Sequence, residues 1–327
     1  MKVFVNKMIP EIGMNLLKQA GLEVILPENE NLTQEEWLQY CRSVDVILSI
    51  GNDFKYDKKF FDTCQNIKAI ALYSVGFDHV DINEAVKRNI PVGNTPDVLS
   101  RATSDVAFLL MQAVARKASY NFQKVKNGNW GSFDPLHALG QELYGKTLGI
   151  FGLGRIGFEM AKKSKHAFDM NIIYHNRNRN EEAEKELGAI YVSFEELITS
   201  SDVLSIHASF TPEHKELFNE EVFKKMKSNA IFVNTARGGF QNQKDLYQAL
   251  TDGTIWGAGL DVTNPEPMSS DDPMLELSNV CVLPHIGSAT MEARNGMARL
   301  AAENLIAFSR GEKMPYCANP EVYSHHS

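Results

Sequence analysis

Residues 147–157 read TLGIFGLGRIG, an apolar run that leads directly into the motif Gly152-Leu153-Gly154-Arg155-Ile156-Gly157. An amphipathic stretch follows at Phe158–Phe168, and a second apolar run follows at Asn171–Tyr174. The spacing predicts a strand, a glycine-rich turn, a helix and a second strand, in that order. A GxGxxG motif alone is weak evidence, but in this context it is typical of a dinucleotide-binding fold.

The three glycines of the motif differ in the part that we expect each to play. Gly152 would make the tight turn, Gly154 would let backbone N–H groups reach a pyrophosphate, and Gly157 would let the helix pack closely on the strand. The N-terminus of that helix carries partial positive charge, which favours phosphate groups. The alternative is an ordinary glycine-rich turn, which leaves the flanking strands without an explanation.

Short apolar runs alternate with amphipathic stretches along most of the chain. The runs in the first third are Lys2–Met8, Glu23–Pro27, Val44–Ile50, Ile67–Val75 and Ile90–Val92. The runs of a second series are Thr147–Phe151, Asn171–Tyr174, Ala189–Val192, Val203–His207, Ala230–Val233, Trp256–Val262 and Val280–Leu283. Strands that alternate with helices form parallel sheets covered by helices on both faces. The predicted fold class is therefore α/β, with two doubly wound parallel-sheet domains.

The order of these elements predicts how the two domains share the chain. A long helical stretch, Ser100–Lys126, lies between the two series, and a last helix is expected at about Met291–Ser309. Because the second sheet ends before the last helix, that helix has only the first domain left to complete. We therefore expect a Rossmann nucleotide-binding domain of residues 101–288, inserted in a flavodoxin-like substrate-binding domain of residues 1–100 and 289–327. The ligand site would lie in the cleft between them.

The composition excludes several classes of protein. The chain has 327 residues, of which 43% are hydrophobic and 23% are charged, as in ordinary globular domains. A formal net charge of -8 argues against a general nucleic-acid or anionic-membrane surface. No run approaches the about 18 apolar residues of a membrane span, and the first residues read as a strand rather than a signal peptide. The expected compartment is the cytoplasm.

The cysteines and the final residues do not indicate a further site. Cys41, Cys64, Cys281 and Cys317 form no CxxC pair and lie near no histidine at metal-ligand spacing. We expect free thiols in or near the core and no bound metal. The ending Tyr323–Ser327 contains two histidines but is expected to be a solvated tail.

The segment after the second strand of the motif bears on the choice of nicotinamide cofactor. An NAD site usually has an acid there to accept the ribose hydroxyls, but this segment has His175, Asn176, Arg177 and Arg179, and its first acid is Glu181. Arginine binds a 2′-phosphate through charge-assisted hydrogen bonds. We therefore predict that NADP(H) is preferred over NAD(H), with Arg177 as the main contact. The alternative is a solvated basic loop.

Three residues in the second half each follow an apolar strand, and we call them the catalytic trio: Arg237, Glu266 and His285. In a doubly wound sheet, ligands bind outside the carboxyl ends of the strands, so these side chains are expected to converge. Reduction of a 2-keto acid needs a cation for the carboxylate and carbonyl, and an acid that protonates the developing alkoxide. Arginine and histidine suit those parts, and a glutamate can orient the imidazole.

The chain resembles the D-isomer-specific 2-hydroxyacid dehydrogenases over essentially its full length. The matching segments are Ser74–Asp81, Asn94–Asp97, Gly152–Gly157, Asn234–Gly238, Gly259–Val262, Pro265–Pro267 and Pro284–Thr290. Within the family it is most similar to the glyoxylate/hydroxypyruvate reductases, including those that also reduce 2-ketogluconate. The resemblance implies reduction of a small 2-keto acid to a D-2-hydroxy acid.

The resemblance also implies a role for individual residues. The catalytic trio would bind the substrate and carry the proton, with the imidazole paired to the glutamate. Further substrate contacts would come from the backbone N–H groups of Val75 and Gly76 and from Ser288. The implied cofactor contacts are Arg155 and Ile156 at the pyrophosphate and Asp261 at the nicotinamide carboxamide. Similar enzymes form homodimers through the nucleotide-binding domain, with the segment around Asn127–Tyr144 reaching across. Trp130 and Phe133 are candidates for that contact, and the alternative is ordinary burial of both in the core.

One segment departs from the family, and three rival functions remain. After Arg237 and Gly238 the family usually has an apolar residue and then an acidic pair, but here Gly239–Gln243 reads GFQNQ, without negative charge. Glu266 argues against a formate dehydrogenase, which has glutamine there. A phosphoglycerate dehydrogenase is disfavoured by the basic segment after the second strand and by the lack of a regulatory domain. The catalytic trio favours an enzyme over a dinucleotide-sensing corepressor without excluding dual use.

Overall fold

A computed structural model of the chain describes residues 1–326, with side chains as far as Ser324. The chain divides into two compact units. Unit 1 consists of Met1–Leu99 and Ala289–Ser327, and unit 2 consists of Ser100–Ser288. Of the predicted solvated tail Tyr323–Ser327, the side chains of the last three residues lie outside the described part. The prediction is wrong for Tyr323, which is partly buried and whose hydroxyl accepts a hydrogen bond from the N–H of Met314 at 3.0 Å. No helix in the described residues is both long enough and apolar enough to cross a membrane.

Unit 1 contains a five-stranded parallel sheet in the order β2-β1-β3-β4-β5. Its strands are β1 (Lys2–Val5), β2 (Glu23–Ile25), β3 (Val46–Ser49), β4 (Ala69–Leu72) and β5 (Val92–Gly93). Its helices are α1 (Glu11–Gln19), α2 (Gln34–Arg42), α3 (Lys58–Thr63), α4 (Ile82–Lys87) and α12 (Met291–Ser309), followed by the 3-10 helix η4 (Pro320–His326). The strand order is that of the flavodoxin-like fold.

Unit 2 contains a seven-stranded parallel sheet in the order β12-β11-β10-β9-β6-β7-β8. Its strands are β6 (Thr147–Phe151), β7 (Asn171–His175), β8 (Ile190–Tyr191), β9 (Val203–Ile206), β10 (Ile231–Asn234), β11 (Gly257–Leu260) and β12 (Val280–Val282). Its α-helices are α5 (Ser100–Ala115), α6 (Ala118–Lys126), α7 (Arg155–Phe168), α8 (Glu181–Leu187), α9 (Phe194–Ser200), α10 (Glu220–Lys225) and α11 (Gln243–Thr251). Three 3-10 helices are η1 (Pro212–His214), η2 (Gly238–Phe240) and η3 (Pro273–Glu276).

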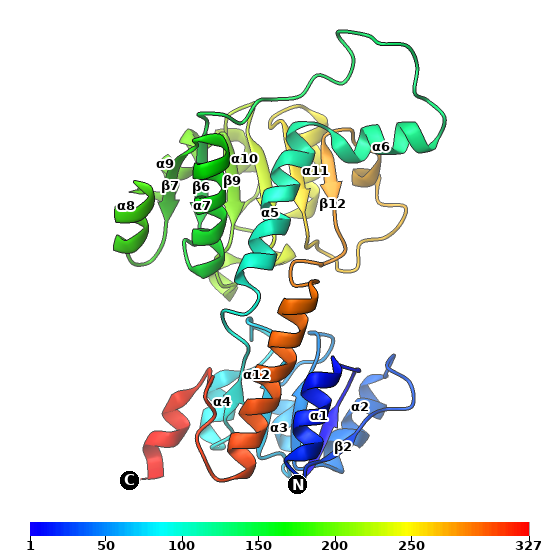
Figure 1. The fold of residues 1–327 in the computed structure, drawn as a ribbon, viewed down its shortest axis with the longest axis vertical. Coiled ribbons are helices and arrows are strands. Elements are labelled where there is room, and N and C mark those ends of the chain that lie inside the picture. Colours follow the sequence, from blue (N-terminus) through cyan, green and yellow to red (C-terminus); the bar gives the residue numbers. More distant parts are fainter. Residues whose placement is uncertain (327) are drawn as a thin grey trace. The chain divides into compact units, whose positions relative to one another are not determined.

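The core of unit 2 explains why its strands read as continuous apolar runs. Helices cover both faces of the sheet (Figure 1), so successive side chains of one strand are buried on opposite sides. Phe232 belongs to one buried cluster, whereas Ile231 and Val233 belong to the other. The prediction of two doubly wound parallel sheets is confirmed.

The prediction of one helix over Ser100–Lys126 is wrong in one respect, because the structure divides this stretch into α5 and α6. Lys117 adopts φ +51°, and its ammonium group lies 5.0 Å from the centre of the Trp256 ring. The carbonyl of Ala115 at the end of α5 accepts a hydrogen bond from the N–H of Gln141 at 2.8 Å. These are contacts with distant parts of the chain, so helical spacing does not reveal the break. After α6, the chain leaves the body of unit 2 as a projecting arm (Figure 1).

The predictions of the last helix and of free thiols in or near the core agree with the structure. The last helix spans Met291–Ser309, as predicted, and Thr290 Oγ1 caps it by accepting from the N–H of Ala293 at 3.1 Å. All four cysteines are free thiols, three of them buried and Cys317 partly buried.

Candidate active site

The glycine-rich turn joins β6 to α7. Gly152 has φ +97°, and a Cβ at this position would lie 2.3 Å from the backbone nitrogen of Ala208, so only glycine fits. A Cβ at Gly154 would meet no atom within 4 Å, and Gly154 stands at the N-cap of α7 without a side-chain cap. The N-terminus of α7 is therefore open for an anionic group. This donor set fits the pyrophosphate of a dinucleotide.

The first turn of α7 contains the other residues predicted for this motif. A Cβ at Gly157 would lie 2.6 Å from the carbonyl oxygen of Gly152, so the helix packs directly on the turn. Arg155 and Ile156 begin the helix and are exposed and half-buried, respectively. They stand at the end of α7 where the sequence analysis expects the pyrophosphate.

Side-chain amides tie the loop after β7 to the glycine-rich turn. Asn176 Oδ1 accepts a hydrogen bond from the N–H of Leu153 at 2.6 Å, and Asn180 Nδ2 donates to the carbonyl of Leu153 at 2.9 Å. Nδ1 of His175 lies 2.9 Å from the carbonyl oxygen of Val192. The loop that follows the second strand is the part of a Rossmann fold that contacts the ribose of a dinucleotide. Its backbone is thus fixed relative to the pyrophosphate site.

The two arginines of this loop differ in their surroundings. The side chain of Arg177 is exposed. Arg179 forms a two-pronged ion pair with Glu184 of α8, with Nε–Oε1 at 2.9 Å and Nη2–Oε2 at 2.8 Å. The sequence does not point to Glu184 as a partner of Arg179, because a spacing of five residues across a loop and a helix start matches no regular pattern.

His285 and Glu266 are in direct contact. Nδ1 of His285 lies 2.5 Å from Oε1 of Glu266, although 19 residues separate them in the sequence. Glu266 lies on the loop after β11, and His285 lies on the loop after β12, so adjacent parallel strands bring them together. Both side chains are partly exposed, at 45% and 35% for His285 and Glu266. The other imidazole nitrogen, Nε2, remains to exchange a proton with a substrate.

Asp261 braces the loop that carries His285. Its carboxylate accepts hydrogen bonds from the backbone N–H groups of Ile286 at 2.8 Å and Gly287 at 2.7 Å, and its own carbonyl accepts from the N–H of His285 at 3.0 Å. Burial raises the pKa of Asp261, whereas the two hydrogen bonds to its carboxylate act in the opposite direction. This contact is not visible in the sequence, because Asp261 lies 25 residues or more from the groups that its carboxylate binds. The three hydrogen bonds of Asp261 hold the loop in which His285 has a backbone φ of +54°.

The loop after β10 positions Arg237 through a buried amide. Asn234 Oδ1 accepts from the N–H of Ala236 at 2.8 Å, and Asn234 Nδ2 donates to the carbonyl of Arg237 at 2.8 Å. Nη1 of Arg237 donates to the carbonyl of Ala236 at 2.8 Å. A Cβ at Gly238 would lie 1.9 Å from the carbonyl oxygen of Thr263, so this loop packs tightly against the loop that leads to Glu266.

The departure from the family at Gly239–Gln243 has a structural explanation. Gln241 is fully buried, and its Oε1 accepts a hydrogen bond from Asn234 Nδ2 at 2.5 Å. Gln243 Oε1 accepts from the N–H of Asn264 at 3.3 Å. Neutral amides therefore connect the loop of Arg237 to the loop of Glu266, where an acidic pair would add negative charge beside Glu266.

The predicted substrate contacts of unit 1 lie on a turn after β4. Asn94 Nδ2 donates to the carbonyl of Val75 at 2.9 Å, and Ser74 Oγ donates to the carbonyl of Gly76 at 2.7 Å. Within the described residues, neither the N–H of Val75 nor that of Gly76 donates to another protein group. The carbonyls of the turn are fixed while these two donors remain for a ligand. Ser288 is half-buried at the end of unit 2.

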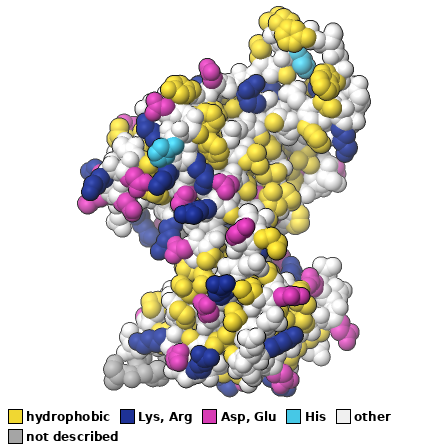
Figure 2. Space-filling view, viewed as in Figure 1, with side chains coloured by type: hydrophobic (Ala, Val, Ile, Leu, Met, Phe, Trp, Pro, Cys, Tyr) yellow, Lys and Arg dark blue, Asp and Glu magenta, His cyan; other side chains and the backbone are white. Residues whose placement is uncertain are grey.

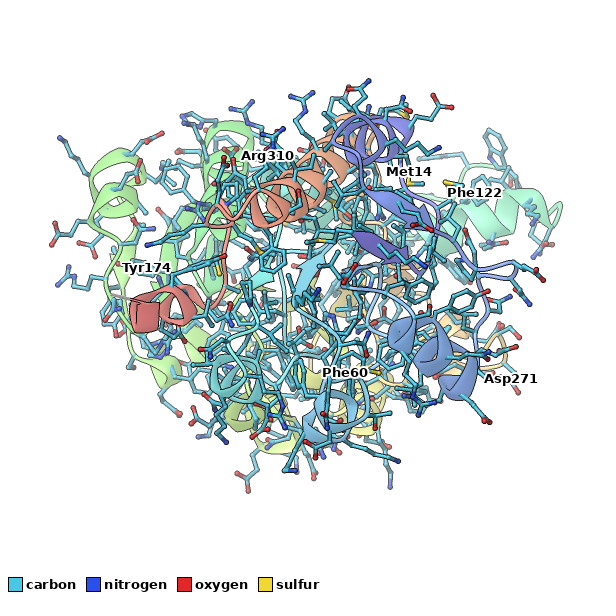
Figure 3. The ribbon with its side chains drawn as sticks, turned by 90° about the horizontal axis from the view of Figure 1, so that it is seen from below. Met14, Phe60, Phe122, Tyr174, Asp271 and Arg310 are labelled. Atoms are coloured by element: carbon cyan, nitrogen blue, oxygen red, sulfur yellow. The ribbon has the colours of Figure 1, made fainter. Side chains whose placement is uncertain are left out.

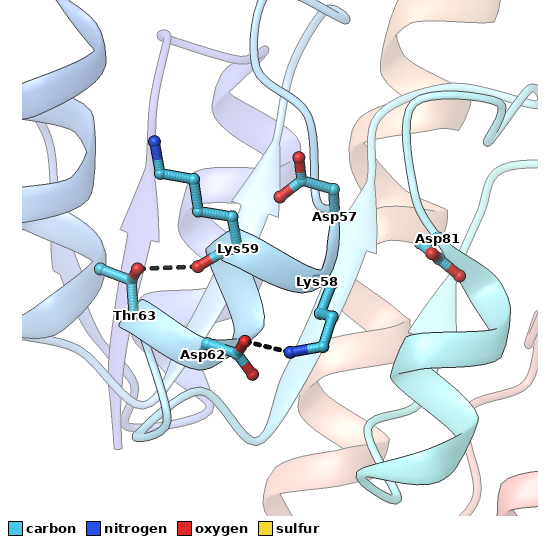
Figure 4. Close-up of a pocket in the computed structure, with 6 residues that line it drawn as sticks. All are labelled: Asp57, Lys58, Lys59, Asp62, Thr63 and Asp81. Atoms are coloured by element: carbon cyan, nitrogen blue, oxygen red, sulfur yellow. Dashed lines mark hydrogen bonds and ion pairs between the residues drawn. The ribbon is translucent and has the colours of Figure 1, made fainter.

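A hollow on the surface of unit 1 is lined by charged side chains (Figure 4). Asp57 and Asp81 cap helices α3 and α4 through their side chains. Lys58 Nζ lies 2.5 Å from Asp62 Oδ2 within α3. Four charged side chains of this hollow thus have structural partners, namely those of Asp57, Lys58, Asp62 and Asp81, and we assign no function to it.

Comparison with known proteins agrees with the geometry of unit 2. The family model described as "D-isomer specific 2-hydroxyacid dehydrogenase, NAD binding domain" matches residues 108–287. The chain is 44% identical over 325 residues to a glyoxylate reductase of Thermococcus litoralis, covering 98% of this chain and 97% of that protein.

Two solved structures are similar along nearly the whole chain. A glyoxylate reductase from Paecilomyes thermophila has a TM-score of 0.87 at 31% identity, covering 98% of this chain and 99% of that one. An NADPH-dependent glyoxylate/hydroxypyruvate reductase from Sinorhizobium meliloti, in complex with NADP and malonate, has a TM-score of 0.83 at 30% identity, covering 97% and 96%. The predicted family and the predicted class of enzyme are confirmed. The chain belongs to the D-isomer specific 2-hydroxyacid dehydrogenase family.

Proposed function

We propose that this protein reduces small 2-keto acids to D-2-hydroxy acids, with glyoxylate and hydroxypyruvate as first substrates and 2-ketogluconate within its range. The observation that carries the proposal is the contact of 2.5 Å between His285 Nδ1 and Glu266 Oε1. A paired imidazole at the carboxyl end of the sheet is the proton donor that reduction of a carbonyl needs. The similarity to glyoxylate reductases supports this choice of substrate. We place the enzyme in the cytoplasm, where its four thiols stay reduced.

Proton transfer and substrate binding are carried out by different residues of the site. When bound, the reduced nicotinamide supplies a hydride to the carbonyl carbon of the substrate. His285 gives its Nε2 proton to the oxygen that becomes the hydroxyl, and Glu266 keeps the ring oriented and compensates its positive charge. Arg237 binds the carboxylate and polarises the carbonyl. The N–H groups of Val75 and Gly76 also hold the carboxylate, with Ser288 near the substrate.

Initial rates with a panel of substrates test this proposal. Oxidation of NADPH and of NADH would be followed with glyoxylate, hydroxypyruvate and 2-ketogluconate as acceptors. We expect turnover on at least the first two. Measurable dinucleotide binding without turnover on any of the three would contradict the proposal and favour a dinucleotide-sensing function, whereas turnover only on a phosphorylated 2-keto acid would favour a phosphoglycerate dehydrogenase.

The cofactor is proposed to be NADP(H) in preference to NAD(H), because Arg177 is exposed on a loop without an acidic residue. Replacing Arg177 by Gln should raise KM for NADPH about tenfold, since one charge-assisted hydrogen bond contributes about 1.5–3 kcal/mol. KM for NADH should change less than about twofold. Steady-state kinetics with both cofactors measures this. Lys185→Gln on α8 is the matched control for loss of an exposed cation. An equal rise in both KM values would contradict the assignment.

The arm of residues 127–144 is proposed to pair with a second copy of the chain. Trp130 and Phe133 are 82% and 92% exposed, and Leu136 is also largely exposed. Figure 2 shows hydrophobic side chains gathered on the projecting segment, and Figure 3 shows Phe122 at the surface of the preceding helix, α6. Such a cluster at one place on a surface is typical of a protein–protein interface.

Removal of these two aromatic side chains should therefore dissociate the dimer. We expect Trp130→Ser combined with Phe133→Ser to shift the protein from dimer to monomer at micromolar concentration, as measured by sedimentation velocity. Ile190→Ser, at another exposed apolar side chain, should leave the dimer intact. A monomeric wild-type protein, or a dimer that persists in the double variant, would contradict this interface.

A further inference from the structure

The proposed 2′-phosphate site contains a carboxylate as well as arginines. Glu184 is only 21% exposed, and both of its oxygens contact Arg179, whose side chain is 64% exposed. Oε1 of Glu184 also accepts a hydrogen bond from the hydroxyl of Tyr174 at 2.6 Å. The same hydroxyl accepts a hydrogen bond from the N–H of Asn180 at 2.7 Å. Glu184 is thus fixed beneath the loop that carries both arginines.

Arg179 also lies over an aromatic ring. Its guanidinium carbon lies 5.9 Å from the centre of the Tyr191 ring, and the hydroxyl of Tyr191 donates to the carbonyl of Asn176 at 3.1 Å. Glu184 occupies the Nε–Nη2 edge of the guanidinium, so a phosphate would bind at the remaining Nη1 and Nη2 donors, directly beside the carboxylate. The ion pair with Arg179, followed by the hydrogen bond from Tyr174, lowers the pKa of Glu184, so this competitor is ionised at neutral pH.

We propose that Glu184 determines cofactor specificity, because it competes with the 2′-phosphate of NADP(H) for Arg179. The inference rests on the proposed function of the Arg177–Arg179 loop and deepens it. Arg177 binds the phosphate, while the charge of Arg179 is already balanced by Glu184. The selectivity for NADP(H) over NAD(H) is therefore smaller than two arginines would give, and NAD(H) remains usable.

Binding of nucleotide fragments to the full-length apo protein tests this without turnover. Calorimetric Kd values would be measured for 2′,5′-ADP, which has the 2′-phosphate, and for 5′-AMP, which lacks it. Glu184→Gln keeps the size of the side chain and an oxygen acceptor for Tyr174 but removes the charge. We expect it to bind 2′,5′-ADP about tenfold more tightly, equivalent to about 1.4 kcal/mol, and 5′-AMP within about twofold of wild type.

Two further variants separate competition from a general effect of charge. Glu182→Gln, on the same helix and exposed, removes an equal charge and should leave both Kd values within about twofold of wild type. Glu184→Asp keeps the charge but shortens the side chain, so it should bind 2′,5′-ADP more tightly than wild type but less tightly than Glu184→Gln does. Thermal unfolding of each variant checks that the fold is intact, and if Glu184→Gln unfolds, Glu184→Asp decides the test.

The outcomes distinguish this inference from the proposed function. If Glu184→Gln leaves the Kd for 2′,5′-ADP unchanged, or tightens both nucleotides equally, competition for Arg179 is overturned. A gain equal to that of Glu182→Gln would also overturn it. If wild type binds the two nucleotides equally and Arg177→Gln changes neither, the preference for NADP(H) itself fails.

Discussion

Replacing His285 by Asn should lower kcat for glyoxylate by about 10²–10⁴-fold, because asparagine cannot donate a proton to the developing alkoxide. The change removes the acid and not the pocket, so KM for glyoxylate and the Kd of NADPH should change only a few-fold. Steady-state rates and fluorescence titration of NADPH measure the two effects separately.

A second histidine variant gives the control for this experiment. His166→Asn on α7 changes an exposed histidine whose ring contacts a carbonyl of its own helix, and it should keep wild-type rates. Glu266→Gln should fall between wild type and His285→Asn, because the amide still accepts a hydrogen bond from the imidazole but no longer compensates its charge. Turnover of His285→Asn within about threefold of wild type would contradict the role of His285 as the acid.

Replacing Arg237 by Gln should lower kcat/KM about 10³-fold, because it removes both the anchor of the carboxylate and the group that polarises the carbonyl. A fall in kcat together with a rise in KM would indicate that Arg237 acts in the transition state as well as in binding. A rise in KM with kcat unchanged would instead restrict Arg237 to ground-state binding and would contradict the polarising role.

Arg237→Lys is the matched variant for this change. Lysine keeps the charge but lacks the planar pair of donors, so it should recover only part of the activity. Added guanidinium ion should raise the rate of Arg237→Gln and not that of wild type, since it can occupy the space left by the side chain. Unchanged backbone geometry is expected, because Asn234 holds this loop through the main chain at Ala236 and Arg237.

The features of the molecule that follow from the sequence are those that depend on a local pattern of residues. The runs at Thr147–Phe151 and Ala230–Val233 predict strands because buried parallel strands are apolar on both faces. Strand ends then predict a common edge for His285 and Glu266, which the structure brings into contact. The glycine-rich motif belongs to this group as well, because its context of strand and helix is visible in the sequence.

The parts that the sequence did not reveal depend on contacts between distant residues. Nothing near Lys117 indicates that the helix breaks there, since the reason lies in the contact with Trp256 and in the capped carbonyl at the end of α5. The bracing of the His285 loop by Asp261 depends likewise on the pairing of β11 with β12, which brings Asp261 to the N–H groups of Ile286 and Gly287. Gln241 reads as a loss of charge in the sequence, and only its burial against Asn234 shows what replaces that charge.

The configuration of the product tests the central claim most directly. The wild-type enzyme would reduce hydroxypyruvate with NADPH to completion, and the glycerate would be resolved on a chiral column. We predict a single enantiomer, because one face of the carbonyl receives the hydride while His285 protonates the oxygen, and we expect D-glycerate because the family is D-isomer specific. L-Glycerate, a racemic product or no glycerate at all would contradict the account.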